Sequence, residues 1–207
     1  MADLSAAILA GGRATRFGGA NKALLRVGGV RIVDRLVAAL EPVAQDLFIV
    51  APDAAAYADL GLRVVGDVIP GAGSLGGIYT AIVESRCPRT IVVACDMPFI
   101  TTELLQALVA VEPTDVVLPR TAQGYEPLCA VYAKSCGPVF RDRIMRGELR
   151  VAAAREALRV AEIGPETLAA FDREGRLFAN VNTPHDYERA KGQIELKPDP
   201  TQDRITD

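Results

Sequence analysis

Residues 4–22 read LSAAILAGGRATRFGGANK. Leu4 to Ala10 form an apolar run that stops at two glycines, which is typical of a buried strand in a parallel sheet. Glycines let the backbone approach a ligand closely and turn its N–H groups inward, and Arg16 and Lys22 add positive charge to the same loop. A buried strand followed by such a loop predicts a site for a triphosphate. The loop is not a Walker A sequence, because no Gly-Lys-Ser/Thr occurs in it.

Apolar runs and segments of helical periodicity alternate along the rest of the chain. The later predicted strands cover residues 47–51, 63–65, 90–94, 115–118, 127–132 and 159–163. Helices are predicted over residues 32–40 and about 53–60, and another is predicted to pass through residues 81–83 after the glycine-rich stretch 70–77. A helix that Thr101 or Thr102 can cap has its core face within residues 104–109, two helical pieces follow around 135–146 and 150–157, and a last helix starts at Thr183-Pro184. This alternation favours an α/β fold, a Rossmann-like three-layer sandwich around a mostly parallel central sheet.

The composition indicates one folded domain without a basic surface. The chain has 207 residues, of which 50% are hydrophobic, so we expect a single domain over residues 1–194. Residues 195–207 are polar and contain two prolines, and we expect them to form a disordered tail. The net charge of -3 argues against a nucleic-acid partner.

The cysteines and the apolar runs bear on where the protein works. The four cysteines are scattered without a CxxC pair, which excludes the usual spacings of zinc sites and disulfide frameworks. The N-terminus has no basic leader, and no apolar run approaches the ~20 residues of a membrane-spanning helix. We therefore expect a cytoplasmic monomer.

Two aspartates follow predicted strands directly. Asp96 comes after strand 90–94, and Asp67 comes after strand 63–65. Ligands of α/β folds bind beyond the carboxyl ends of the strands, and Mg²⁺ prefers one or two carboxylates together with phosphate oxygens. Asp96 is therefore the predicted metal ligand, and Asp67 a predicted contact to the nucleotide or support for the metal. The alternative for either residue is a turn or capping aspartate.

Asn180 and Asn182 stand one residue apart before the predicted helix start at Thr183-Pro184. On extended backbone two such side chains point to the same side, where they can hydrogen-bond a polar heterocycle or a phosphate. The alternative is that this segment only forms a turn and a helix cap. The single histidine, His185, lies in the first turn of that helix and is expected on the surface, so a histidine-activated nucleophile is not predicted.

A second glycine-rich segment offers a rival interpretation. Gly71, Gly73 and Gly76 spell GxGxxG, and Asp96 follows twenty residues after Gly76 at the end of a strand, which imitates the fingerprint of NAD-binding oxidoreductases. In that fingerprint, however, the glycines begin where the strand ends, whereas residues 67–70 intervene here. That rival would also leave Arg16 and Lys22 without a role.

Taken together, these segments resemble the molybdenum cofactor guanylyltransferases, a family of the nucleotidyltransferase superfamily that attaches GMP to molybdopterin. The family pattern LAGGxxxRxGGxxK stands at residues 9–22, CDxP at residues 95–98, and NVNTP at residues 180–184. The resemblance extends from about residue 5 to residue 190. It implies a nucleotide-diphospho-sugar-transferase-like fold, with nucleotide bound by the N-terminal half and acceptor by the C-terminal half.

The resemblance also implies a role for each matching residue. The implied catalytic residues are Arg16, Lys22 and Asp96, with Asp96 as the ligand of an Mg²⁺ cofactor. The implied nucleotide-binding residues are Leu9, Ala10, Gly11, Gly12, Lys22, Asp67 and Asp96. Asn180 and Asn182 would bind the acceptor. GTP and molybdopterin are the implied substrates, and a transient contact with cofactor-delivery proteins or molybdoenzymes is expected.

Several related activities stay open at this point. The same fold could serve a molybdopterin cytidylyltransferase, a cobinamide-phosphate guanylyltransferase or a sugar-1-phosphate nucleotidyltransferase, and a nucleotide-binding module without turnover is a further alternative. Gly11-Gly12 favours guanine, because the related cytidylyltransferases tend to read LAAG at this point. The family often places an asparagine after the second strand, where this chain has Ala51-Pro52. Any contact to the base there would come from the backbone.

Overall fold

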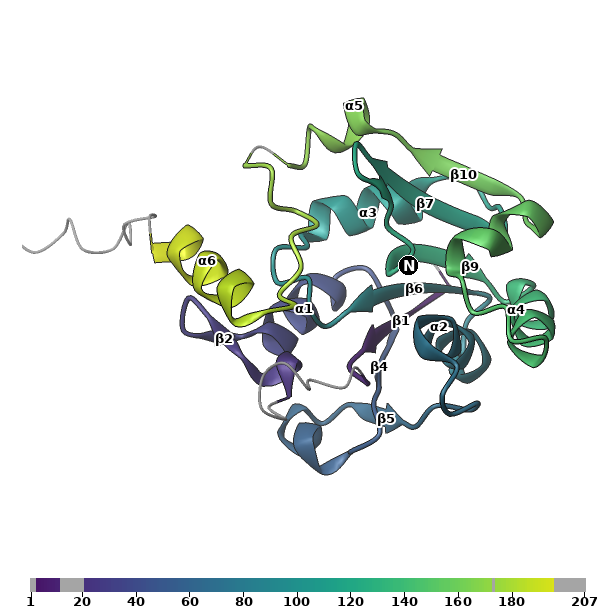
Figure 1. The fold of residues 1–207 in the computed structure, drawn as a ribbon, viewed down its shortest axis with the longest axis horizontal. Coiled ribbons are helices and arrows are strands. Elements are labelled where there is room, and N and C mark those ends of the chain that lie inside the picture. The colour runs from purple at the N-terminus through teal and green to yellow at the C-terminus, as the bar shows by residue number, and fades with distance from the viewer. Residues whose placement is uncertain (1–2, 12–20, 173, 196–207) are drawn as a thin grey trace, which may run out of the picture.

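The computed structural model describes residues 3–11, 21–172 and 174–195, and in this part of the chain one mixed sheet lies between two layers of helices (Figure 1). The strands of the sheet are β1 (Leu4–Leu9), β4 (Asp46–Val50), β5 (Arg63–Val65), β6 (Arg89–Ala94), β7 (Val116–Thr121), β8 (Gly124–Tyr125), β9 (Cys129–Ala133) and β10 (Val160–Ile163). They lie in the order β10-β7-β9-β6-β1-β4-β5, and β8 pairs with β7.

The strand directions bring several carboxyl ends to one edge of the sheet. β1 pairs in parallel with both β4 and β6, β4 pairs in parallel with β5, and β7 pairs in parallel with β10. β9 runs antiparallel between β6 and β7, and β8 is antiparallel to β7. The predicted, mostly parallel α/β sheet is therefore confirmed, with β9 reversed inside it.

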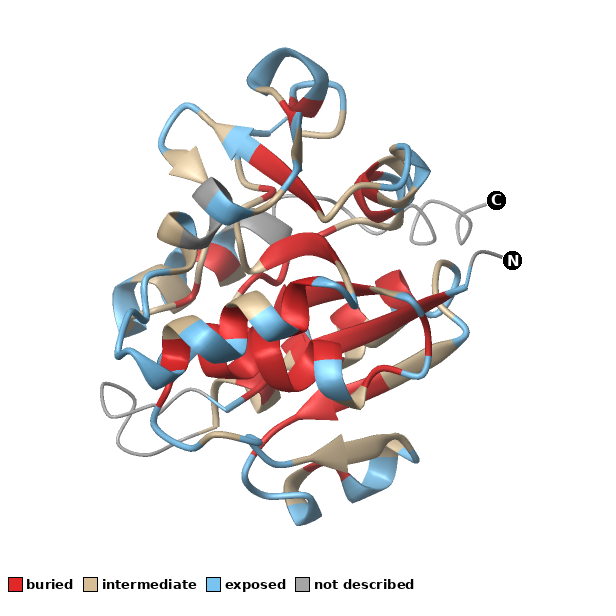
Figure 2. Cartoon of the chain, turned by 90° about the vertical axis from the view of Figure 1, so that its right-hand side faces the viewer, coloured by how far each residue is buried: buried red, intermediate tan, exposed pale blue. Residues whose placement is uncertain are grey.

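Helices cover both faces of the sheet because the strands carry apolar side chains on both sides. α1 (Ile32–Leu40) and α3 (Thr102–Ala110) cover one face, and α2 (Gly73–Glu84) and α4 (Cys136–Met145) cover the other. Along β1, Ala6 and Ile8 pack into the cluster under α1 and α3, whereas Ala7 between them packs under α2 and α4. Figure 2 shows the buried residues gathered along the strands and the inner faces of the helices.

Smaller elements surround this sandwich. They are the 3-10 helices η2 (Lys22–Leu24), η3 (Ala55–Leu60) and η4 (Val151–Ala157), the hairpin β2 (Arg26–Val27) and β3 (Val30–Arg31), and the helices α5 (Pro165–Leu168) and α6 (Pro184–Glu195). The helices predicted around residues 53–60 and 150–157 are thus the 3-10 helices η3 and η4, while η2, the hairpin, β8 and α5 were not predicted. Thr101 caps α3 by accepting a hydrogen bond from the Leu104 amide at 3.4 Å.

No helix among the described residues combines the length and apolar character needed to cross a membrane.

The GxGxxG segment serves packing. α2 begins at Gly73, well past the end of β5 at Val65. A Cβ on Gly76 would lie 2.7 Å from the Ala72 Cβ and 3.3 Å from the Ile69 carbonyl oxygen, so this glycine permits close packing at the helix start. The dinucleotide fingerprint requires its acidic residue to follow the strand next to the one before the glycines. Here β4 and β1 separate β5 from β6 in the sheet, so Asp96 does not meet this requirement.

Asp115 and Arg159 join the starts of the two parallel strands β7 and β10. The Asp115 carboxylate accepts hydrogen bonds from the Arg159 amide at 2.9 Å and from its Nε at 3.1 Å. It also accepts one from the Ser135 hydroxyl at 3.2 Å. The Arg159 side chain is the main cause that lowers the pKa of Asp115 from 3.8 to about 2.

Asp115→Asn should lower the free energy of unfolding at pH 7 by about 1 kcal/mol, after allowance for solvent screening at the exposed Arg159. Because folding depresses the pKa of this carboxyl, its stabilisation is present above pH 3.8 and is lost as the pH falls to about 2. Urea unfolding of both proteins across this range measures the difference. A difference that stays constant down to pH 2 would contradict the ionic origin.

Candidate active site

The carboxyl end of β1 is fixed between its two neighbours. The Ala10 amide donates a hydrogen bond to the Val50 carbonyl oxygen at 2.8 Å, and the Leu9 carbonyl oxygen accepts one from the Cys95 amide at 3.0 Å. The predicted nucleotide-binding residues Leu9, Ala10 and Gly11 therefore lie where β1, β4 and β6 end together. Gly12 and Arg16 lie outside the described residues.

Lys22 lies at the start of η2, and its side chain reaches the other predicted half of the site. Its Nζ donates a hydrogen bond to the Asn182 Oδ1 at 2.9 Å, between positions 160 apart in the sequence. Burial raises the pKa of Asp96 and of Cys95, and the positive charge of Lys22 opposes both rises, so the ammonium group lies near both side chains. The structure thus brings Lys22, Asp96 and Asn182 together, as the predicted site requires.

Asp96 follows β6, and its backbone carbonyl group is hydrogen-bonded whereas one oxygen of its side-chain carboxylate is not hydrogen-bonded to any residue that the structure describes. Its backbone carbonyl oxygen accepts a hydrogen bond from the Val181 amide at 2.8 Å. Its carboxylate Oδ1 is buried and has no hydrogen-bond partner among the described residues. Burial raises the pKa of this carboxyl, and the nearby Lys22 charge opposes the rise only in part. The site therefore holds a carboxylate oxygen that a cation or a donor could satisfy.

The segment around Val181 crosses the end of β6 with its asparagines beside Asp96 and Lys22. Val181 itself is 1% exposed and packs in the core. The Asn180 Oδ1 is buried without a partner in the described part of the chain, whereas the Asn182 Oδ1 accepts from Lys22. Burying an amide oxygen without a hydrogen bond costs free energy. An unpartnered oxygen of this kind is typical of a site where a ligand supplies the missing hydrogen bond.

The turn after Asn182 is held by a reciprocal cap at the start of α6. The Asp186 carboxylate accepts hydrogen bonds from the Asn182 and Thr183 amides at 3.2 and 2.9 Å, and the Thr183 hydroxyl accepts one from the Asp186 amide at 3.1 Å. The predicted Thr183-Pro184 helix start is confirmed. His185 is exposed, as expected.

Glu126 is a carboxylate near the site that the sequence analysis missed. It precedes β9, and because β9 runs antiparallel to β6, the start of β9 lies beside the end of β6, where the Ala94 amide donates to the Leu128 carbonyl oxygen at 2.8 Å. Partial burial, and then the negative charge of Asp96, raise the pKa of Glu126. Glu126 could have been found from the sequence only if the antiparallel direction of β9 had been predicted.

Asp67 lies farther from this cluster. It follows β5, the edge strand, which β4 and β1 separate from β6. Its side chain makes no hydrogen bond to another described residue, and partial burial alone raises its pKa. Its predicted contact to the nucleotide stays a prediction, but the structure does not join Asp67 to Asp96 or Lys22.

The end of β4 has no spare backbone donor. The Ala51 amide already donates to the Val65 carbonyl oxygen at 2.9 Å, and Pro52 has no N–H group. A backbone contact to a base at these two residues would therefore involve carbonyl oxygens alone.

Comparisons with known proteins assign the chain to a family. A family model described as the MobA-like NTP transferase domain matches residues 6–161. This chain belongs to that family. It is 33% identical over 190 residues to the molybdenum cofactor guanylyltransferase of Desulfosudis oleivorans, with 91% of this chain and 94% of that protein covered.

Two further matches extend over similar lengths. The chain is 37% identical over 196 residues to the probable molybdenum cofactor guanylyltransferase of Pelotomaculum thermopropionicum, with 94% of this chain and 95% of that protein covered. The crystal structure of molybdopterin-guanine dinucleotide biosynthesis protein A from Archaeoglobus fulgidus superposes with a TM-score of 0.79 at 28% identity and covers 93% of this chain and 100% of that one. The resemblance drawn from the sequence motifs is therefore confirmed.

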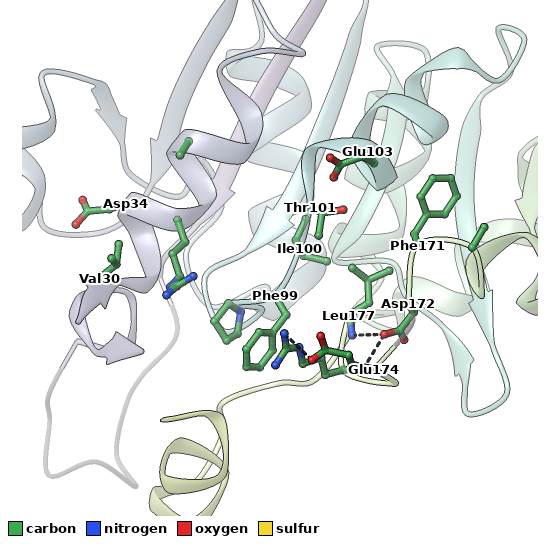
Figure 3. Close-up of a pocket in the computed structure, with 15 residues that line it drawn as sticks. Val30, Asp34, Phe99, Ile100, Thr101, Glu103, Phe171, Asp172, Glu174 and Leu177 are labelled. Carbon is green, nitrogen blue, oxygen red and sulfur yellow. Dashed lines mark hydrogen bonds and ion pairs between the residues drawn. The ribbon is translucent and has the colours of Figure 1, made fainter. Parts of the chain in front are cut away.

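A wide groove of about 990 Å³ in this MobA-like transferase lies apart from the predicted site residues. It is formed by α1, the start of α3 and residues 170–177, with Phe99 beside the guanidinium group of Arg176 (Figure 3). None of the described predicted site residues lines this groove. Its size alone does not make it the active site.

The oxygen atoms of the site fit a magnesium ion. No group of three or more His, Cys, Asp or Glu side chains that could hold a metal occurs among the described residues, which excludes a complete side-chain cage there. Mg²⁺ instead uses one or two carboxylates and takes its remaining ligands from water and phosphate. The buried, unpartnered Asp96 Oδ1 matches that requirement.

Asp96→Asn should raise the melting temperature of the protein without metal or nucleotide, by about 2–4 °C for each kcal/mol gained in a domain of this size. Folding raises the pKa of Asp96, so at pH 7 its buried negative charge opposes folding, and a neutral amide removes that cost. Differential scanning calorimetry in chelator measures the shift. A lower melting temperature would mean that the charge supports the fold.

Proposed function

We propose that this protein transfers GMP from GTP to molybdopterin, with or without bound molybdenum, and releases pyrophosphate. The relatives from D. oleivorans and P. thermopropionicum carry the name of this activity over nearly their whole length. One observation carries the proposal: the Lys22–Asn182 hydrogen bond joins the nucleotide loop to the NVNTP segment beside Asp96. A cation and a carboxylate from the nucleotide half therefore share one site with amides from the acceptor half.

The reaction demands little acid–base chemistry. An oxygen of the acceptor's terminal phosphate attacks the α-phosphorus of GTP, a new P–O bond forms, and the bond from the α-phosphorus to the bridging oxygen breaks as pyrophosphate leaves. The attacking phosphate is already an anion at pH 7, so no strong general base is needed. The protein has to bring two polyanions together and stabilise the charge on the transferred phosphoryl group.

Lys22 suits this task. Its ammonium group donates to the Asn182 amide oxygen and lies near the Asp96 carboxylate, where it would neutralise the triphosphate and the departing pyrophosphate. The backbone of Gly11 would approach the phosphates closely, with Leu9 and Ala10 held by their hydrogen bonds to neighbouring strands. Gly12 and Arg16 would complete the phosphate loop, and Asp67 would contact the nucleotide.

Asp96 would hold Mg²⁺ through its buried Oδ1. When bound, the ion would supply charge neutralisation at the phosphate oxygens. Asn180 and Asn182 would face the acceptor side, and the unpartnered Asn180 Oδ1 would accept a hydrogen bond there. The reaction would take place in the cytoplasm, with transient contacts to cofactor-delivery proteins or molybdoenzymes.

Purified protein with Mg²⁺ and molybdenum-loaded molybdopterin should release pyrophosphate with GTP and not with CTP or ATP. A coupled pyrophosphate assay with each triphosphate in turn measures this. Release with CTP alone would keep the reaction class and overturn guanine as the base. Binding of GTP without release for any phosphorylated acceptor would instead favour a module without turnover.

Two substitutions should separate the proposed roles. Asp96→Ala should abolish pyrophosphate release while the circular dichroism spectrum stays native, because the proposed metal ligand is lost. Lys22→Ala should weaken GTP binding by about tenfold, a typical cost of one hydrogen bond to a charged group, and should slow transfer. Isothermal titration with GTP and the same assay measure both effects. A fully active Asp96→Ala protein would contradict the role of Asp96 as metal ligand. Normal GTP affinity in the Lys22→Ala protein would contradict the role of Lys22 in binding the triphosphate.

A further inference from the structure

The turn that carries Lys22 is too short to hold itself in place. η2 spans only Lys22–Leu24, and an isolated turn of this length has no stability of its own. Lys22 nevertheless has to keep its ammonium group within hydrogen-bond distance of Asn182. Something outside η2 must therefore fix the direction in which the chain enters it.

Asn21 is the residue that fixes this entry. Its extended backbone (φ -70°, ψ 113°) makes it the N-cap of η2, and its Oδ1 accepts a hydrogen bond from the Ala23 amide at 3.1 Å. Ala23 is fully buried in the core cluster under α1 and α3. Lys22 thus stands between a capping side chain and a buried alanine, and its position follows that of Asn21.

Tyr57 in turn holds Asn21. The Asn21 Nδ2 donates a hydrogen bond to the Tyr57 hydroxyl oxygen at 2.8 Å, and the hydroxyl lies 3.2 Å from the Asn21 Oδ1, to which it donates. Tyr57 belongs to η3, follows β4, and is 1% exposed. Its ring packs in the same core cluster as Ala23, so the hydroxyl presents a fixed polar point at the edge of the core.

This arrangement is not explained by packing alone. A phenylalanine would fill the same space, and a buried hydroxyl is costly unless it is hydrogen-bonded. No described residue other than Asn21 hydrogen-bonds the Tyr57 hydroxyl. η3 is also tied to the hairpin that follows η2 by the ion pair of Asp59 with Arg31 at 2.6 Å, so the two segments are joined twice.

We propose that Tyr57, acting through Asn21, is a positioning residue that sets Lys22 for the nucleoside triphosphate. The inference rests on the proposed function, because it gives Lys22 the role of binding the triphosphate. In this role Tyr57 acts through its hydrogen bonds to Asn21 and not through a contact of its own with the triphosphate. Its hydroxyl transmits the rigidity of the core to a turn that lies at the sheet edge.

Tyr57→Phe tests the proposal, since it removes the hydroxyl and keeps the ring. We expect the dissociation constant for GTP with Mg²⁺, measured by isothermal titration, to rise about 3- to 10-fold, the effect of one neutral hydrogen bond. Asn21→Ala should weaken GTP binding at least as much, because it removes the cap and the bridge together. Tyr125→Phe is the control: it also deletes a tyrosine hydroxyl hydrogen bond, to Glu162, but on β8, which pairs with β7 and not with β1 or β4, the strands that precede Asn21 and Tyr57, and it should leave GTP affinity unchanged.

A double-mutant cycle separates positioning from a merely structural role. If Tyr57 acts through Lys22, Tyr57→Phe should have no further effect on GTP affinity in the Lys22→Ala protein. An equal loss in both backgrounds, or no loss in the single variant, would overturn the proposal. Thermal denaturation of each variant reports any change in stability separately.

The titration also distinguishes this inference from the proposed function. GTP binding that depends on Tyr57 in a protein that transfers nothing would refute the proposed reaction and support the positioning role. Normal transfer with GTP affinity that is insensitive to Tyr57→Phe would do the reverse. A chain that binds no GTP would refute both.

Discussion

The hydrogen bond from the Val181 amide to the Asp96 carbonyl oxygen is the contact on which the rest of the site depends. It fixes the C-terminal segment across the end of β6 and leaves the Asp96 carboxylate unused. Asn180 and Asn182 flank this bond, so their distance from Asp96 and Lys22 is set by backbone geometry. A backbone hydrogen bond of this kind places the side chains on either side of it without involving them.

Much of the fold could be predicted from the sequence because it depends on local pattern. The apolar run before Gly11 and the helix start at Thr183-Pro184 can be recognised by residue type and spacing, and both appear where expected. Glu126 could not be predicted, because its place beside Asp96 depends on β9 running antiparallel. The role of Tyr57 could not be predicted for a related reason: its partner Asn21 lies 36 positions away in the sequence, and a single buried tyrosine looks like any other core residue.

The candidate site departs from the rules that the core obeys. Side chains under α1 and α3 pack against one another, whereas Asp96 and Asn180 each bury an oxygen without a partner among the described residues. Such groups oppose folding, so their presence at the edge of a well-packed sheet is expected where a ligand later satisfies them. Asp67 shows what a local sequence pattern cannot predict. The pattern places Asp67 directly after a strand, but the order of the strands in the sheet separates it from Asp96.

The 160 positions between Lys22 and Asn182 also bear on when the site can exist during folding. Closing a long loop is slow compared with local contacts, and a ribosome delivers the N-terminal residues first. β1, β4, β5 and β6 are complete by residue 94, long before the asparagines have been synthesised. A nascent chain can therefore build the part of its sheet formed by β1, β4, β5 and β6 before Asn182 is available to Lys22, and the reactive arrangement is among the last to assemble.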